Sequence, residues 1–326
     1  MQIPDSVQTF DGAAVRRLLP MALCVDLMAE VQKGLSRGEI PLPLRSFLPL
    51  PGEAGRALGV MPGALPERGV FGCKLISLFP ENPAAGRPAI QGSVLLFSSD
   101  HGAPVALVDA AALTAIRTAA ASAAATRALA RPDAHVLALV GTGVQAQSHL
   151  EAMLCVRSIS TVRVWGRTPA HVRAFCASAS ARYQIPVTAA TSIEDAVTGA
   201  DLVCAVTAAA QPVLRGPCLT PGCHLNLVGA HSAGTREADG AALAGARIFT
   251  EVGAFAEAEA GDILLALDEG AIEATQIVGE IGAVLAGALP GRESAADITV
   301  YKSLGNVAQD LIAASEVYLR GRNGGA

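Results

Sequence analysis

The hydrophobic pattern of the first third of the chain changes at about residue 40. From about 11 to 36, apolar residues recur every three or four positions, which predicts two short helices. Between 40 and 110, short apolar runs are broken by Pro and Gly, which is typical of antiparallel strands. The runs at 94–97 and 105–108 enclose a turn with Asp and Gly and predict a hairpin. A long alanine-rich helix is expected over 111–130.

After Pro132 the pattern becomes an alternation of strands and helices. Strands are expected at 136–140, 162–165, 187, 202–206, 225–228 and 247–250, with helices between them. This alternation implies right-handed crossovers and a parallel sheet covered on both faces. The predicted fold class is therefore α/β, with a Rossmann dinucleotide-binding domain over 126–297 and an α+β domain over 1–125. The segment 298–326 is expected to return to the α+β domain.

The strand over 136–140 runs into a glycine-rich turn and then a helix. Gly141 permits the tight turn, and Gly143 leaves no side chain between the backbone and a phosphate. Ala146 keeps the helix close to the strand, while the free N–H groups of the first helical turn face the anion. Strand, turn and helix together are the context that this motif requires. The predicted cofactor contacts are Gly141, Thr142, Gly143, Val144, Gln145 and Ala146.

The end of the second Rossmann strand bears on the choice of cofactor. In NAD-binding folds an acidic side chain about twenty residues beyond the glycines hydrogen-bonds the ribose hydroxyls. This chain has Gly166, Arg167 and Thr168 there, with no carboxylate. Arg167 is suited to pair with a 2′-phosphate, and the hydroxyl of Thr168 can add a hydrogen bond, which favours NADP(H). NAD(H) stays open, because Arg167 can equally be a solvated loop residue.

Composition narrows the partners and the compartment. The net charge of −5 and the lack of basic runs argue against a nucleic-acid groove. No stretch of about 18 strongly apolar residues is present, so no membrane span is expected. Residues 1–5 show neither a basic region nor a following apolar stretch, so we expect no export signal and a cytoplasmic protein. The seven cysteines are scattered without a CxxC pair, which predicts neither disulfides nor a metal site.

Three sequence blocks outside the glycine motif carry a resemblance to a known family. They are Leu113 to Ser122 (LTAIRTAAAS), Asn226 to His231 (NLVGAH), and a C-terminal set made of Pro290-Gly291-Arg292, Thr299, Lys302 to Gly305 and Asp310. With them the chain resembles the ornithine cyclodeaminase and mu-crystallin family over nearly its whole length. The resemblance implies a homodimer in which the N-terminal sheets pair across the two-fold axis. It also implies that the domain formed by 1–125 and 298–326 binds the substrate, a small amino or imino acid.

The resemblance places three cations on the substrate carboxylate: Arg45, Lys74 and Arg117. The chemistry supports this role, because a guanidinium offers two parallel hydrogen bonds to a carboxylate and a lysine adds a point charge. Three cations would hold an α-imino acid with its C2 facing the hydride donor. Lys74 and Arg117 lie in largely apolar segments, where an unpaired charge would be costly. Lys74 is also taken as a catalytic residue.

Two departures from the family pattern argue against cyclisation of ornithine. In the cyclodeaminase branch an aspartate occupies the position of His231, and a glutamate precedes the Met-Pro pair; this chain has Gly59 before Val60-Met61-Pro62. A second amino group would lack both carboxylate partners. What remains is hydride transfer between NAD(P)H and a C=N bond. His231 is a candidate catalytic residue that protonates or hydrogen-bonds the imine nitrogen; the alternative is a loop histidine that caps Ser232 or Thr235.

The resemblance also implies further cofactor contacts. Other polar residues are interpreted as having structural roles. The implied cofactor contacts are Thr207, Gly229, Lys302 and Ser303. For His149, packing is favoured over contact with the cofactor. Asp262 and Glu259 read as helix-start and surface residues.

The sequence therefore predicts an NAD(P)H-dependent imine reductase. Its expected substrates are small cyclic ketimines such as Δ1-pyrroline-2-carboxylate or Δ1-piperideine-2-carboxylate, which give L-proline or L-pipecolate. Three alternatives remain: an amino-acid dehydrogenase of the alanine or N-methyl amino acid type, an ornithine cyclodeaminase, and a non-catalytic binding protein like mu-crystallin.

Overall fold

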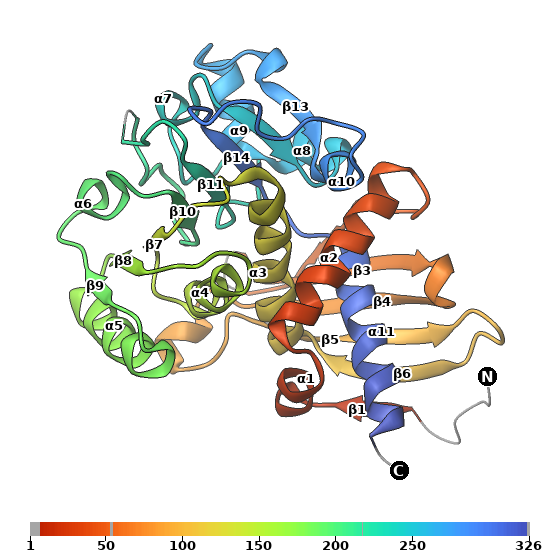
Figure 1. Cartoon of the computed structure of the whole chain (residues 1–326). Helices are drawn as coiled ribbons and strands as arrows, with labels where there is room; N and C mark the ends of the chain where they lie inside the picture. The colour runs from red at the N-terminus through yellow and green to blue at the C-terminus, as the bar shows by residue number, and fades with distance from the viewer. Residues whose placement is uncertain (1–6, 53–54, 217, 325–326) are drawn as a thin grey trace. The chain divides into compact units, whose positions relative to one another are not determined.

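A computed structural model describes residues 7–52, 55–216 and 218–324, and the chain forms two units (Figure 1). The first unit comprises residues 1–117 and 305–326, and the second comprises residues 118–304. The expectation of no export signal rests on residues 1–5, which lie outside the described residues. In the described residues, no helix is both long and apolar enough to cross a membrane.

The first unit is built on a six-stranded sheet with the order β1-β6-β5-β4-β3-β2. Strand β1 pairs parallel with β6, and every other pair is antiparallel. The predicted antiparallel strands and the hairpin of β5 and β6 are confirmed. The strands are β1 (Gln8–Phe10), β2 (Ser46–Pro49), β3 (Ala57–Leu65), β4 (Val70–Leu78), β5 (Ile90–Ser98) and β6 (Pro104–Asp109), and two short 3₁₀ turns, η1 (Pro66–Arg68) and η2 (Asn82–Ala85), join some of them.

Three helices cover one face of this sheet: α1 (Gly12–Leu18), α2 (Met21–Ser36) and α11 (Val307–Asn323) (Figure 1). The carboxylate of Asp11 caps α1 by accepting from the Ala14 N–H at 2.8 Å, and Asn306 caps α11. The two expected N-terminal helices are present, although α2 spans 16 residues and is not short. Helix α11 packs along β3, β4 and β5, so residues from its first turn lie over the middle strands.

The opposite sides of the same strands carry exposed apolar side chains. Phe71 and Leu75 on β4 and Leu107 on β6 are among the exposed large hydrophobics. Side chains alternate along a strand, and Lys74, between Cys73 and Leu75, therefore lies on the face that the helices cover. The rings of Phe71 and Phe97 stack across β4 and β5 with centroids 5.1 Å apart.

The second unit is built on an eight-stranded parallel sheet with the order β13-β12-β14-β11-β10-β7-β8-β9. The predicted Rossmann fold is confirmed, and each expected strand is found within two residues of its expected bounds. The strands are β7 (Val136–Val140), β8 (Thr161–Trp165), β9 (Val187–Ala189), β10 (Leu202–Ala205), β11 (His224–Leu227), β12 (Arg247–Thr250), β13 (Ile277–Glu280) and β14 (Thr299–Lys302). The chain reverses its direction of winding between β7 and β10, where open α/β sheets bind their ligands.

One expected boundary is corrected by the sheet. Strand β14 pairs parallel with both β11 and β12, so residues 298–304 belong to the second unit and only the following helix α11 belongs to the first. All four residues of β14 are buried, which suits a central strand. Strand β13, at the edge, was not predicted. A local sequence pattern can predict that a segment forms a strand. It does not predict which strands pair with that segment in the sheet, because those strands can be far away in the sequence.

Helices flank this sheet and close its core. They are α3 (Ala110–Leu129), α4 (Val144–Val156), α5 (Pro169–Tyr183), α6 (Ile193–Val197), α7 (Gly240–Leu243), α8 (Gly253–Glu259), α9 (Gly261–Asp268) and α10 (Ile281–Leu285), with a 3₁₀ turn, η3 (Ala274–Gln276), before β13. Helix α3 is the expected alanine-rich helix, and the boundary between the units falls within it, after Arg117. One core cluster joins Leu129 to Phe249, Ile281 and Tyr301. This packing fixes the central strands whose carboxyl ends carry the candidate loops.

Candidate functional site

The glycine loop follows β7 and has the backbone that a phosphate-binding turn needs. Gly141 has φ +126°, and a Cβ there would lie 2.8 Å from the carbonyl oxygen of Val206, so only glycine fits. Its N–H donates to the Trp165 carbonyl at 2.8 Å, which anchors the loop to β8. Gly143 is the N-cap residue of α4, and a Cβ built on it meets no atom within 4 Å. The approach to the first turn of α4 is therefore open at this position.

The first turn of α4 (Val144–Val156) lies beside this opening, and the N–H groups of a first helical turn have no intrahelical partners. Ala146 is fully buried, as the expected close packing of helix on strand requires. Val144 is 66% exposed, an unusual position for a large apolar side chain. Gly166 accommodates Thr142, whose Cγ2 would lie 2.9 Å from an added Cβ. Gly141, Gly143 and Ala146 thus fit the pyrophosphate of a dinucleotide.

Arg167 and Thr168 follow β8 and are both exposed. Thr168 is the N-cap residue of α5, but its side chain makes no capping hydrogen bond. The positive end of the α5 dipole lies at the start of this helix, directly after Thr168. Contact of Arg167 and Thr168 with the adenosine ribose stays a prediction from the sequence.

Thr207 and Gly229 lie after the neighbouring strands β10 and β11, and a buried carboxylate joins them. Glu237 Oε1 accepts from the N–H and the hydroxyl of Thr207 at 2.6 and 2.7 Å, and Oε2 accepts from the N–H of Gly229 at 2.5 Å. Burial raises the pKa of Glu237, while these donors act in the opposite direction. A Cβ on Gly229 would overlap the carbonyl oxygen of Thr207. Glu237 was not among the site residues predicted from the sequence, because a single glutamate in a loop gives no sign that it is buried.

Lys302 and Ser303, at the end of β14, have internal partners. Lys302 Nζ donates to Asp262 Oδ2 at 2.7 Å and to the Ala230 carbonyl at 2.5 Å, and the Ser303 hydroxyl donates to Glu251 Oε1 at 2.9 Å. Asp262 is fully buried, so the expectation of a surface residue was wrong, although it does lie in the first turn of α9. Its other oxygen accepts from the N–H groups of Glu237 and Ala238. Lys302 therefore stabilises the conformation of the loop after β11.

The two candidate histidines differ in environment. His231 is exposed, and its Nδ1 lies 3.1 Å from the Gly229 carbonyl oxygen. Ser232 and Thr235 hydrogen-bond each other at 2.9 Å. His149 is fully buried on α4, with Nδ1 2.8 Å from the Gln145 carbonyl and Nε2 2.9 Å from the Ser122 hydroxyl. Burial lowers the pKa of His149 to about 4, so it is neutral at pH 7 and fits the packing role.

In the first unit, Lys74 and Arg117 meet at one carboxylate. Lys74 Nζ and Arg117 Nε both donate to Asp310 Oδ1, at 2.9 and 3.0 Å. Lys74 also donates to the Thr114 hydroxyl at 2.7 Å, and Arg117 NH1 donates to Gln309 Oε1 at 2.8 Å. All three charged side chains are at most 8% exposed. Asp310 was known from the sequence only as part of the C-terminal block.

Arg45 contributes to the electrostatics of this cluster. It lies just before β2 and is half-buried. Burial lowers the pKa of Lys74 to about 8, with further lowering from the charges of Arg117 and Arg45, while Asp310 raises it. The structure therefore brings Lys74 and Arg117 together and places Arg45 within electrostatic reach of Lys74.

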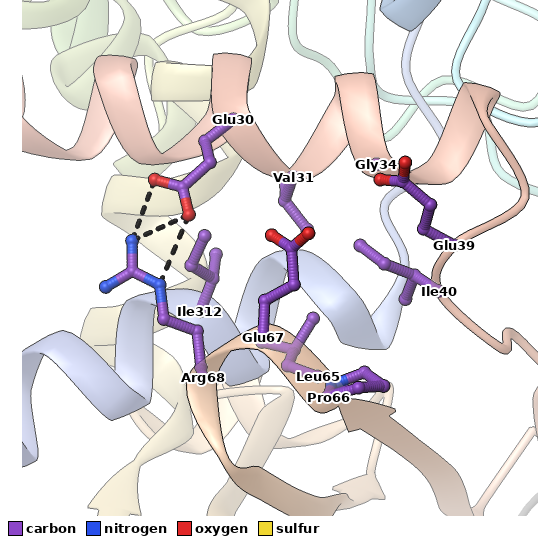
Figure 2. Close-up of a pocket in the computed structure, with 10 residues that line it drawn as sticks. All are labelled: Glu30, Val31, Gly34, Glu39, Ile40, Leu65, Pro66, Glu67, Arg68 and Ile312. Atoms are coloured by element: carbon purple, nitrogen blue, oxygen red, sulfur yellow. Dashed lines mark hydrogen bonds and ion pairs between the residues drawn. The ribbon is translucent and has the colours of Figure 1, made fainter.

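A separate pocket of the first unit lies between α2, the end of β3 with its 3₁₀ turn, and α11 (Figure 2). Its charged lining is mostly acidic: Glu30, Glu39 and Glu67, with Arg68 held by Glu30 at 2.7 Å. Such a lining repels the carboxylate of an amino or imino acid. None of the predicted site residues lines it. Within the described residues, no group of three or more His, Cys, Asp or Glu side chains could hold a metal ion.

Comparison with known proteins gives relatives along nearly the whole chain. The model of the ornithine cyclodeaminase/mu-crystallin family matches residues 10–325. A Δ1-pyrroline-2-carboxylate reductase of Bacillus cereus is 34% identical over 306 residues, with 94% of each chain covered. The ketimine reductase mu-crystallin of Mus musculus is 36% identical over 291 residues, covering 89% of this chain and 88% of that one.

Two solved structures are similar in fold and sequence. The Thermococcus litoralis Δ1-pyrroline-2-carboxylate reductase in complex with NADH and L-proline has a TM-score of 0.94 at 29% identity, covering 98% of this chain and 99% of that one. An archaeal alanine dehydrogenase dimer with bound NAD has a TM-score of 0.91 at 28% identity, covering 98% and 97%. The resemblance seen in the sequence blocks is confirmed: the chain belongs to the ornithine cyclodeaminase/mu-crystallin family.

Proposed function

We propose that this protein is an NAD(P)H-dependent imine reductase that converts small cyclic ketimine carboxylates, such as Δ1-pyrroline-2-carboxylate or Δ1-piperideine-2-carboxylate, to L-proline or L-pipecolate. The observation that carries the proposal is the buried pair of cations, Lys74 and Arg117, on the same chain as an intact dinucleotide loop. Relatives that are named Δ1-pyrroline-2-carboxylate reductase or ketimine reductase align with almost the full chain.

The cations supply the site for the substrate carboxylate. Arg117 presents a planar guanidinium, and Lys74 carries a third N–H beyond those used by Asp310 and Thr114. Arg45 adds a positive charge that the substrate carboxylate offsets. Binding there fixes the imino acid at its C1 end, so the orientation of C2 is restricted before reaction.

The glycine loop, Arg167, Thr168, Thr207 and Gly229 would hold the cofactor. When bound, a reduced nicotinamide supplies the hydride that forms the new C2–H bond. The electron pair of the C=N π bond then moves to nitrogen, where a proton completes the amine. We assign His231 to hydrogen-bond or protonate that nitrogen, because it lies in the loop after β11, with Nδ1 3.1 Å from the Gly229 carbonyl oxygen, and an imidazolium can give up a proton near neutral pH. For Lys302 and Ser303, contact with the cofactor stays a prediction. Their side-chain bonds to Ala230, Asp262 and Glu251 also assign them to shape the same loops.

Turnover is the direct test of this function. We expect oxidation of NADPH, or of NADH, with either cyclic imine and without added amine. The variant Lys74→Met should lose at least about tenfold in kcat/KM, because it removes a charge-assisted bond to the substrate that contributes about 1.5 to 3 kcal/mol. Turnover only with pyruvate plus ammonia or methylamine would contradict the proposal and favour an amino-acid dehydrogenase. Absence of turnover with all these substrates, in protein that binds cofactor, would favour a cyclodeaminase or a binding protein.

The variant Gly143→Asp tests the cofactor loop. The added side chain enters open space, so the thermal midpoint should change little. Its carboxylate would repel the pyrophosphate at the start of α4, and the Kd for NADPH should rise at least about tenfold, which is about 1.4 kcal/mol. Titration of NADPH fluorescence measures this change, with Ala177→Asp on the exposed side of α5 as the control. An unchanged Kd would place the pyrophosphate elsewhere.

We propose that NADP(H) is preferred over NAD(H), because Arg167 and Thr168 stand exposed where a 2′-phosphate would lie and no carboxylate stands with them. The variant Arg167→Ala should raise the KM for NADPH about tenfold or more, as expected for a lost charge-assisted hydrogen bond, and leave that for NADH unchanged. Steady-state kinetics with each cofactor measure the ratio. The control is Arg173→Ala, an exposed arginine on α5. A wild-type protein that prefers NADH, as the bound cofactors of the solved relatives allow, would overturn this preference.

We propose that the protein is a homodimer formed through the exposed apolar face of the six-stranded sheet. The face carries Phe71, Leu75 and Leu107, and apolar groups of this kind gain free energy when they are buried. A solved relative is described as a dimer. The variant Leu75→Asp should raise the dimer dissociation constant at least about a hundredfold, or about 2.8 kcal/mol, because it buries a carboxylate among apolar groups.

Sedimentation velocity over a concentration series measures the dimer equilibrium. The matched control is Leu319→Asp, because Leu319 on α11 is 37% exposed and Leu75 is 39% exposed. A Leu75→Asp protein that remains dimeric at the same concentrations would exclude this face as the interface.

A further inference from the structure

One buried carboxylate lies between two of the proposed substrate-binding cations. Asp310, in the first turn of α11, accepts from Lys74 and from Arg117 through the same oxygen, Oδ1. Its side chain is 1% exposed. The other oxygen, Oδ2, is buried and has no hydrogen-bond partner among the described residues. A carboxylate with one oxygen shared and the other unpaired is costly to bury, so its position calls for an explanation.

We propose that Asp310 is the positioning residue of the substrate site: it holds the Lys74 ammonium and the Arg117 guanidinium side by side and supplies the negative charge that lets both remain cations in a buried place. The proposal rests on the proposed function for its consequence in catalysis. Asp310 acts through the two cations and does not itself contact the substrate carboxylate, which it would repel.

The first turn of α11 fixes the orientation of both side chains. Gln309 and Asp310 are consecutive, and they hold Arg117 through NH1 and Nε. Lys74 is held by Asp310 and by Thr114 of α3. Long side chains such as Lys and Arg lose rotamer freedom when they bind a ligand. Here that freedom is already lost in the folded protein, so less is lost when the substrate arrives.

The charges of the cluster also depend on Asp310. The charged or titratable groups that act on the Lys74 ammonium are Arg117 from α3, Arg45 from the segment before β2, and Asp310 from α11. Cys24 of α2, near Arg117 and Asp310, stays a neutral thiol because burial raises its pKa far above its ordinary value. Without Asp310 the group would hold three cations and no carboxylate. Lys74 would then lose its proton at lower pH.

The small number of lysines gives a direct readout. The chain contains three, Lys33, Lys74 and Lys302, so a protein labelled with ¹³C at lysine Cε gives three signals, and Lys74→Arg identifies the signal of Lys74. We expect this signal to titrate near pH 8 in the wild-type protein. In Asp310→Asn the midpoint should fall by at least about one pH unit, because the carboxylate that favours the charged amine is gone.

Kinetics give the catalytic consequence. Above the Lys74 midpoint, each unit of downward shift leaves about tenfold less protonated Lys74, so kcat/KM of Asp310→Asn should fall about tenfold relative to wild type, mostly through KM. The control is Glu316→Gln, which removes another carboxylate of α11 that contacts Arg68 and not Lys74. It should leave both the midpoint and kcat/KM unchanged.

Two outcomes, both independent of turnover, would overturn the inference. A Lys74 midpoint in Asp310→Asn equal to that of wild type overturns it. If Asp310→Asn does not fold, Arg117→Gln serves instead: removing that cation should raise the Lys74 midpoint, and an unchanged midpoint would contradict a shared cluster. The NMR titration needs no substrate, so failure of the proposed function, seen as wild-type protein without turnover, is distinguishable from failure of this inference.

Discussion

The burial of two cations against one carboxylate is the constraint on which the first unit depends. An unpaired ion in a protein interior costs several kcal/mol, and breaking a buried pair by removing one partner costs about 3 to 5 kcal/mol. Lys74 and Arg117 avoid this cost because α11 brings the carboxylate of Asp310 over the middle of the sheet. The position of the C-terminal helix on β3, β4 and β5 is thus tied to the same charges that would receive a substrate carboxylate.

The second unit keeps its loops in place by a different buried network. Lys302 binds Asp262, Asp262 accepts from the backbone of Glu237, and Glu237 accepts from the loops after β10 and β11. Each buried carboxylate is satisfied by several donors, which makes such a network rigid rather than costly. The loops that carry Thr207 and Gly229 are therefore held in defined conformations by hydrogen bonds within the protein.

Local patterns in the sequence were sufficient for most elements of the fold. The glycine loop, the alternation after Pro132 and the hairpin of β5 and β6 are local, and each was predicted. The place of β14 was not, because a strand that inserts between β11 and β12 is determined by pairing partners 50 or more residues away. A similar limit applies to the buried cluster of Lys74, Arg117 and Asp310, since Asp310 lies 236 positions from Lys74 and no spacing rule connects them.

Glu237 and Asp262 show the same limit for polar residues. A glutamate between Arg236 and Ala238, and an aspartate at a helix start, both have the pattern of surface residues. Their burial follows from donors that other segments provide, Thr207 and Gly229 for Glu237 and Lys302 for Asp262. The sequence blocks of the family contained Lys302 but gave no indication of which carboxylate it meets.

We propose that the chain delivers a hydride to C2 of an imine whose carboxylate is held by buried cations. The most direct measurement uses NADPH deuterated at C4 on either face, with Δ1-pyrroline-2-carboxylate, and locates the label in the product by NMR and mass spectrometry. Hydride transfer to C2 predicts L-proline with one deuterium, on the α-carbon, from one of the two labelled cofactors. Proline without deuterium at that carbon from either cofactor, or no proline at all, would contradict it.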